Sequence, residues 1–180
     1  FWCLYASLAY ARHFPTIDPL RSYSLYSDRF KNYYNGTVAP DWGELVGKTM
    51  GILQEEASLN EIVRLVGIDA LGFKDRITME CARSIREDYL HQNSFDEVDT
   101  YTSLNKQYNM LKLIISWYDK ALAALGQHVQ LDKLIDMPIR EHIGRAKYIP
   151  EKEEKEKFAA LNKEMDKAFS ELTEEGGANA

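Results

Sequence analysis

Apolar residues recur every three or four positions along most of the chain, which predicts an all-α fold. The longest regular run consists of Leu104, Tyr108, Leu111, Ile115, Tyr118, Leu122 and Leu125. A second row widens the apolar face beyond the seam of a coiled coil: Ile114, Trp117, Ala121 and Ala124. We therefore expect a long helix at the centre of a bundle, with Ser103 as its N-cap and Gly126 at its end.

Shorter helices are expected on both sides of this central one. They cover about 4–12, 25–34, 41–57, 59–66, 75–91 and 131–135, with another after Pro138 and a last one after Pro150. Pro15 and Pro19 predict a loop near the N-terminus, and 92–99 forms another. The fold class is therefore a multi-helix bundle of six to eight helices.

Two of these boundaries depend on local patterns. The 41–57 helix has an apolar stripe of Val46, Met50, Leu53 and Ala57. Ser58 and Glu61 then match a capping box, which predicts that a separate helix begins there and ends at Gly67. The last helix, 150–175, carries many charges and a thin apolar stripe made of Phe158, Leu161, Met165, Ala168 and Leu172. Such a helix either packs in a groove or pairs with a partner. Residues 176–180 are expected to be disordered.

Composition and charge exclude some classes of function. The chain has 28 Asp and Glu against 22 Lys and Arg, a net charge of −6, which argues against nucleic acid as a partner. No apolar run is long enough for direct insertion into a membrane. Cys3 and Cys81 lack a Cys-x-x-Cys motif and are interpreted as two buried, reduced thiols. The four histidines lack metal-ligand spacing, so we expect no metal site.

The stretch Gly47-Lys48-Thr49 looks like the end of a phosphate-binding P-loop. A P-loop needs four residues between its first Gly and the Gly-Lys pair, whereas only three separate Gly43 from Gly47. On the expected 41–57 helix, Lys48 lies opposite the apolar stripe. We interpret it as a surface lysine.

The residues alone suggest no catalytic machinery. Asp96, Glu97 and Asp99 could form an acid–base pair, but an acidic loop before a helix explains them better. Two aromatic residues stand in loops, Phe14 before Pro15 and Phe95 after Ser94. Such rings either pin a loop to the core or offer a flat platform for a base or ring ligand.

Several long segments, in order, resemble one known family. They are LAYARHFPTIDPLRSYSLY, LQEEASLNEIVRLVGIDAL, DRITMECARSIREDYLHQNSFDEVDTYTSLNKQYNMLKLI and IREHIGRAKYIPE. Together they resemble the C-terminal helical domain of the catalytic A subunit of archaeal- and vacuolar-type rotary ATPases. The resemblance implies that the chain is a fragment of a longer subunit, consistent with its start at Phe1. A stand-alone helical protein-interaction module without catalytic activity is the alternative.

The resemblance also implies a nucleotide site. The family's adenine pocket draws two aromatics from this region, and by position they match Phe14 and Phe95. Gln92 and Asn93 lie in the same loop as Phe95 and are expected to contact the base or ribose. The P-loop, the catalytic glutamate and the magnesium site would lie upstream. ATP or ADP with magnesium is therefore expected in the full-length subunit, and no tightly bound cofactor in this fragment.

A second implied site faces the central rotor. The matching loop is 68–76, and its expected contact residues are Asp69, Leu71, Phe73 and Lys74. This chain lacks the Pro and consecutive acids that relatives carry in the loop, so we expect an apolar, steric contact. It also has Asp18-Pro19 where many A subunits have Asn-Trp.

The resemblance divides the chain into the end of the nucleotide-binding domain with a hinge (1–20), a helical bundle (21–149), a charged helix (150–175) and a tail (176–180). It implies B subunits of an alternating hexameric ring and the rotor stalk as partners. It places the subunit in the cytoplasm, peripheral on the membrane. It leaves open proton against sodium coupling, and ATP synthesis against hydrolysis.

Overall fold

The computed structural model describes residues 1–177, and in these residues the chain is built from helices. The α-helices are α1 (Ala6–Tyr10), α2 (Ser27–Thr37), α3 (Trp42–Val66), α4 (Phe73–Ser84), α5 (Leu104–Gly126), α6 (Leu131–Ile135), α7 (Ile139–Arg145) and α8 (Glu154–Gly177). Three 3₁₀ turns, Ile68–Ala70, Ala146–Tyr148 and Glu151–Glu153, and a π-helix, Ile85–Leu90, complete the set. The all-α prediction is confirmed.

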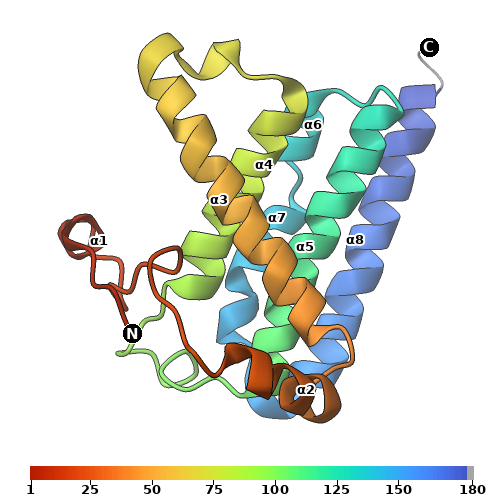
Figure 1. The fold of residues 1–180 in the computed structure, drawn as a ribbon. Helices are drawn as coiled ribbons and strands as arrows, with labels where there is room; N and C mark the ends of the chain where they lie inside the picture. The colour runs from red at the N-terminus through yellow and green to blue at the C-terminus, as the bar shows by residue number, and fades with distance from the viewer. Residues whose placement is uncertain (178–180) are drawn as a thin grey trace.

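Helix α5 lies at the centre of the bundle, between α3 and α4 on one side and α8 on the other (Figure 1). Its predicted ends are confirmed, because the Ser103 side chain accepts a hydrogen bond from the Lys106 amide and the helix ends at Gly126. Trp117, Leu113 and Ala121 of this helix have almost no exposed surface. The core is therefore organised around the strongest periodicity in the sequence.

The last helix packs against the bundle. Helix α8 runs beside α5 (Figure 1), and Phe158, Met165 and Phe169 are buried between α8 and its neighbours. Phe169 lies outside the predicted stripe. Helix α8 extends to Gly177, two residues into the segment expected to be disordered. Residues 178–180 of that tail lie outside the described part of the chain.

The prediction that the chain breaks at Ser58 is wrong, since α3 is one helix of 25 residues. The Ser58 hydroxyl donates back to the Gln54 carbonyl at 3.4 Å and caps nothing. The predicted apolar face is also displaced, because Val46 and Ala57 are exposed. The buried positions are Leu45, Thr49, Ile52, Leu53, Glu56 and Leu59.

Two buried polar residues explain why the buried face of α3 was predicted wrongly. Thr49 donates to the Leu45 carbonyl at 2.8 Å, and Glu56 binds Arg86, so both are buried without unsatisfied groups. The predicted end of α3 is confirmed. Gly67 follows the helix with φ of 88°, a conformation that strongly favours glycine.

Four smaller expectations need adjustment. Helix α1 begins at Ala6 rather than Leu4. Helix α2 continues through Asn35-Gly36 to Thr37, and the backbone amide of Val38 donates a hydrogen bond to the Tyr34 carbonyl of its last turn. The predicted 75–91 helix starts at Phe73 and changes to a π-helix at Ile85. Cys81 is buried as expected, whereas Cys3 is only partly buried.

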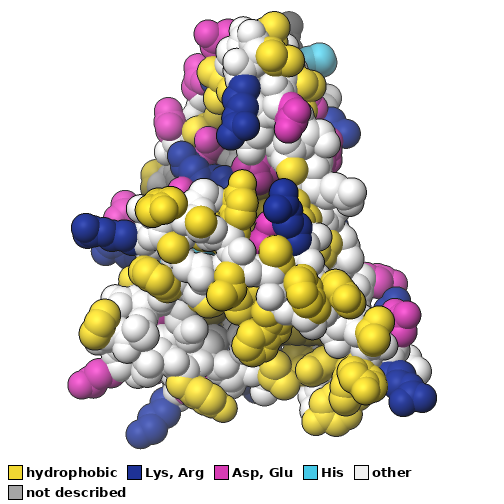
Figure 2. Space-filling view, turned by 60° about the vertical axis from the view of Figure 1, so that its left-hand side comes forward, with side chains coloured by type: hydrophobic (Ala, Val, Ile, Leu, Met, Phe, Trp, Pro, Cys, Tyr) yellow, Lys and Arg dark blue, Asp and Glu magenta, His cyan; other side chains and the backbone are white. Residues whose placement is uncertain are grey.

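The N-terminal segment exposes many large apolar side chains. Figure 1 places α1 to the left of the bundle and α2 at its lower end, and Figure 2 shows hydrophobic side chains gathered over the lower part of the molecule. The exposed residues in this segment include Phe1, Trp2, Leu4, Tyr10, Tyr23, Leu25 and Tyr26. Among the helices of residues 1–177, none has the length and apolar character needed to cross a membrane.

Candidate functional site

Two distant segments are joined at the base of the N-terminal loop. The backbone amide of Gln92 donates a hydrogen bond of 2.8 Å to the Phe14 carbonyl, and His13 Nε2 donates one of 2.8 Å to the Arg86 carbonyl. The rings of His13 and His91 stack at a centroid distance of 5.1 Å. These contacts hold the loop with Phe14 against the loop with Phe95, as the site prediction requires.

Both predicted aromatic rings point out of the core. The Phe14 side chain is 53 % exposed and the Phe95 side chain 97 % exposed, and within residues 1–177 neither ring makes an aromatic pair. They therefore do not pin their loops to the core of this chain. An exposed Phe loses the free energy that burial would supply, so these rings are available to a ligand or to another domain.

Internal hydrogen bonds fix the shape of the Phe95 loop. Asp99 is buried, and its carboxylate accepts from the Asn93 amide at 2.6 Å. Asp96 accepts from the amides of Val98 and Asp99, each at 2.9 Å. Two members of the acidic cluster thus bind backbone amides, and the cluster forms a loop framework rather than an acid–base pair. These hydrogen bonds fix the backbone of the loop that carries the exposed Phe95 ring.

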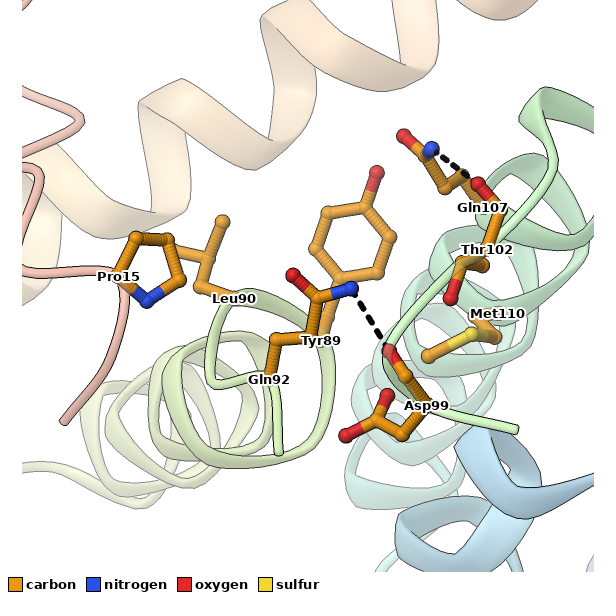
Figure 3. A pocket seen from close by; sticks show the side chains of 8 residues that line it. All are labelled: Pro15, Tyr89, Leu90, Gln92, Asp99, Thr102, Gln107 and Met110. Carbon is orange, nitrogen blue, oxygen red and sulfur yellow. Dashed lines mark hydrogen bonds between the residues drawn. The ribbon is translucent and has the colours of Figure 1, made fainter. Parts of the chain in front are cut away.

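A cavity of about 280 Å³ lies behind this loop. Figure 3 shows its walls, which are Pro15, Tyr89, Leu90, Gln92, Asp99, Thr102, Gln107 and Met110. Burial raises the pKa of Tyr89 to about 12, so its phenol stays neutral and can donate or accept a hydrogen bond. The cavity therefore combines apolar walls with a few polar groups, as small-molecule sites do.

The two predicted amide residues are already engaged by the loop. Gln92 Nε2 donates to the Asp99 carbonyl at 2.7 Å (Figure 3), and Asn93 Oδ1 accepts from the Phe95 amide at 3.1 Å. Gln92 Oε1 and Asn93 Nδ2 have no partner among residues 1–177. Each residue therefore keeps one polar atom for a ligand while its other atom shapes the loop.

Several polar residues around the site were not found from the sequence. Lys147 Nζ donates to the carbonyls of Glu87 and His91, at 3.2 and 3.3 Å, at the end of the π-helix. Lys106 is fully buried and donates to the Lys147 carbonyl at 2.7 Å, and burial lowers the pKa of Lys106. The available signal was that Lys106 stands one turn before buried Met110, on the core face of α5.

The second predicted site is the tip formed by the end of α3, the turn Ile68–Ala70 and the start of α4, at the upper end of the molecule in Figure 1. Asp69 and Lys74 are exposed, and Phe73 is 66 % exposed. Leu71 is only 8 % exposed, so its side chain does not belong to the tip surface. The exposed apolar residues missed by the prediction are Ile62, Leu65, Val66 and Ile68.

The Gly-Lys-Thr stretch is helical, since Gly47, Lys48 and Thr49 lie within α3. Lys48 is exposed, as expected, but binds Asp119 of α5. In the described residues, no three His, Cys, Asp or Glu side chains gather as a metal site.

Comparison with known proteins identifies the family. Residues 31–135 match the model of the C-terminal domain of V and A type ATP synthase. Over 180 residues the chain is 56 % identical to the V-type ATP synthase alpha chain of Thermoanaerobacter pseudethanolicus, covering all of this chain and 30 % of the relative. The alpha chains of Acetivibrio thermocellus (55 %; 96 % of this chain and 29 % of the relative) and Clostridium botulinum (54 %; 98 % and 30 %) are also similar.

These matches show that the chain belongs to the family of the C-terminal domain of V and A type ATP synthase. It corresponds to the C-terminal region of a V-type ATP synthase alpha chain. The chain spans about 30 % of the length of the relatives it matches.

Proposed function

We propose that the chain is part of the catalytic subunit of a rotary ATP synthase, which couples ATP hydrolysis or synthesis to ion transport across a membrane. Its own role is to supply aromatic residues of the adenine pocket and the lever that contacts the central rotor. Family membership and the names of the relatives support the assembly. The single observation that carries the pocket assignment is the 2.8 Å bond from Gln92 to Phe14, which unites the two exposed aromatic loops.

In this proposal, Phe14 and Phe95 contact the adenine ring. Base–aromatic stacking contributes about 1–3 kcal/mol per ring when measured by alanine substitution. Gln92 Oε1 and Asn93 Nδ2 complement it with one acceptor and one donor for the base or ribose. The phosphates, the magnesium ion and the reacting atoms would be held by the rest of the subunit, so this chain contributes binding and orientation rather than bond chemistry.

The tip is the proposed rotor contact. Helix α3 is unbroken over 25 residues, about 37 Å at 1.5 Å per residue, and it ends at the exposed apolar residues of the tip. A continuous, packed helix transmits displacement as a rigid element. Phe73 and its apolar neighbours would push on the rotor stalk, flanked by Asp69 and Lys74. The B subunits of the ring would pack beside this subunit, on the cytoplasmic side of the membrane.

Two matched variants of the full-length subunit test the proposal. Phe14→Ala should raise the Michaelis constant for ATP about 5- to 150-fold, the equivalent of one lost stacking contact, and leave rotor binding unchanged. Phe73→Ala should weaken rotor binding and leave the Michaelis constant unchanged. If both variants alter the same quantity, the two-site assignment is wrong.

A further inference from the structure

The side chain of Arg86 joins the lever helix to the nucleotide loops. Its Nη1 atom donates to Glu56 Oε2 in the middle of α3, and Glu56 is only 5 % exposed. The other carboxylate oxygen of Glu56 accepts from Asn60 Nδ2 at 3.0 Å. A buried carboxylate with both oxygens engaged has a defined geometry, and removal of one partner would leave an uncompensated charge.

The backbone of the same residue holds the N-terminal loop. The Arg86 carbonyl accepts from the His91 amide at 2.9 Å, which closes a π-helical turn, and from His13 Nε2 at 2.8 Å. His13 directly precedes Phe14, and His91 directly precedes Gln92. Arg86 therefore touches α3 through its side chain and both aromatic loops through its carbonyl group.

We propose that Arg86 is a positioning residue that makes nucleotide affinity depend on the position of the lever. A displacement of α3 by the rotor moves Glu56, and the ion pair carries this movement to the π-helix. The π-helix then shifts His13 and His91, which changes the separation of Phe14 and Phe95. The inference rests on the proposed function and names the contact through which its two sites communicate.

Helix α3 also packs against α4, which continues into the π-helix, but its other polar side-chain contacts lead away from the aromatic loops. Asp41 binds Lys112 and Tyr108, and Lys48 binds Asp119, so these residues connect α3 to α5 and not to the aromatic loops. Lys147 does hold the end of the π-helix, but it follows α7, and its Nζ donates to the carbonyls of Glu87 and His91 rather than to a residue of α3. Among these contacts, the Glu56–Arg86 pair is the one that spans lever and pocket.

The test is the ratio of ADP dissociation constants for the complete catalytic ring, measured with and without the rotor stalk. A ligand at one of two coupled sites typically changes the affinity at the other about 5- to 150-fold, so we expect a ratio of at least about 5 for the unmodified ring. In Arg86→Gln and in Glu56→Gln the ratio should fall to about 1. Arg86→Lys, which keeps the charge, should restore part of it. A role in stability alone would not change this ratio.

A matched control lies about one turn earlier, in α4, which continues directly into the π-helix. Arg83 pairs with Glu80 at 2.9 Å at the surface, and Arg140 also binds Glu80. Arg83→Gln should therefore keep the ratio of the unmodified ring. If Arg86→Gln does not assemble, Glu56→Gln with Arg86→Gln replaces it, because this pair of changes leaves no buried charge unpaired.

The possible failures are distinguishable. If Phe14→Ala leaves ADP affinity unchanged, the proposed function fails and the inference fails with it. If Phe14→Ala weakens ADP binding but the Arg86 and Glu56 variants keep the ratio of the unmodified ring, the inference alone is overturned. A ratio of about 1 in the unmodified ring would also overturn it.

Discussion

The backbone amide of Gln92 donates a hydrogen bond of 2.8 Å to the carbonyl oxygen of Phe14. This bond joins the loop before α2 to the loop before α5, although the sequence separates them by three helices. It brings together the two loops that carry the exposed rings of Phe14 and Phe95. The proposed nucleotide site depends on this hydrogen bond.

Leu71 and Phe73 should differ in how much stability their truncation costs. Leu71 is buried at the tip, so Leu71→Ala should lower the free energy of unfolding by about 2 kcal/mol. Phe73 is exposed, so Phe73→Ala should change it by less than about 0.5 kcal/mol. Denaturant unfolding of the chain measures both. Equal losses would mean that Phe73 is part of the packed structure and not a free contact surface.

Substitution of Ser103, a helix cap, and of Ser58, a mid-helix residue, should have different effects on stability. Ser103 caps α5 and also donates to Glu151 at 2.8 Å, so Ser103→Ala should cost about 1 kcal/mol. Ser58 lies within α3, where alanine is favourable, and Ser58→Ala should be neutral within about 0.5 kcal/mol. Thermal unfolding of the two variants gives the comparison. A large loss at Ser58 would indicate that α3 breaks there in solution.

Acid should loosen the junction between the aromatic loops. Burial, the Lys147 ammonium and the His13 ring lower the pKa of His91 below its ordinary value of 6.5, whereas Asp99 and Glu87 act in the opposite direction. The unfolded chain therefore binds a proton more readily than the folded chain. Stability attributable to His91 is present above pH 6.5 and is lost as the pH falls through the window below it.

The measurement is the unfolding free energy at a series of pH values for the unmodified chain and for His91→Phe. The variant keeps an aromatic ring against His13 but has no titrating group. Its stability should fall less than that of the unmodified chain as the pH is lowered from about 7.5 to about 5.5. Parallel pH profiles would show that His91 does not carry the effect.

The two cysteines should differ in reactivity. Burial raises the pKa of the Cys81 thiol to about 12, and the thiolate is the reactive form. Cys3 is partly exposed. Iodoacetamide should therefore label Cys3 in the folded chain and reach Cys81 only after denaturation. Mass spectrometry of the labelled peptides identifies the sites, and early labelling of Cys81 would mean that α4 opens locally.

The sequence predicted the elements whose packing follows a simple period. In α5, apolar residues occupy every core position except that of Lys106, so its central place could be found from spacing and its bounds from Ser103 and Gly126. Helix α3 was divided wrongly because Ser58 and Glu61 match a capping box within a continuous helix, and its buried face was misplaced because two of its core positions are polar. Burial of Thr49 and Glu56 depends on partners that spacing does not reveal, above all Arg86, thirty residues away.

The site shows the same limit. Loop position and family resemblance pointed to Phe14 and Phe95, and the structure brings their loops together. The contacts of Arg86 and Lys147 with the loops were missed because they involve backbone carbonyl groups, which carry no residue-specific signal. Leu71 was placed on the tip surface because its burial depends on how the turn folds back after Gly67.

The most direct test separates the contribution of the adenine base to ATP binding from that of the phosphates. The dissociation constants of ATP and of inorganic tripolyphosphate are measured for the full-length subunit and for its Phe14→Ala and Phe95→Ala double variant. We predict that ATP binding weakens by at least about 5-fold, the effect of one lost stacking contact, while tripolyphosphate binding is unchanged. Unchanged ATP affinity, or equal losses for both ligands, would contradict the adenine-pocket assignment.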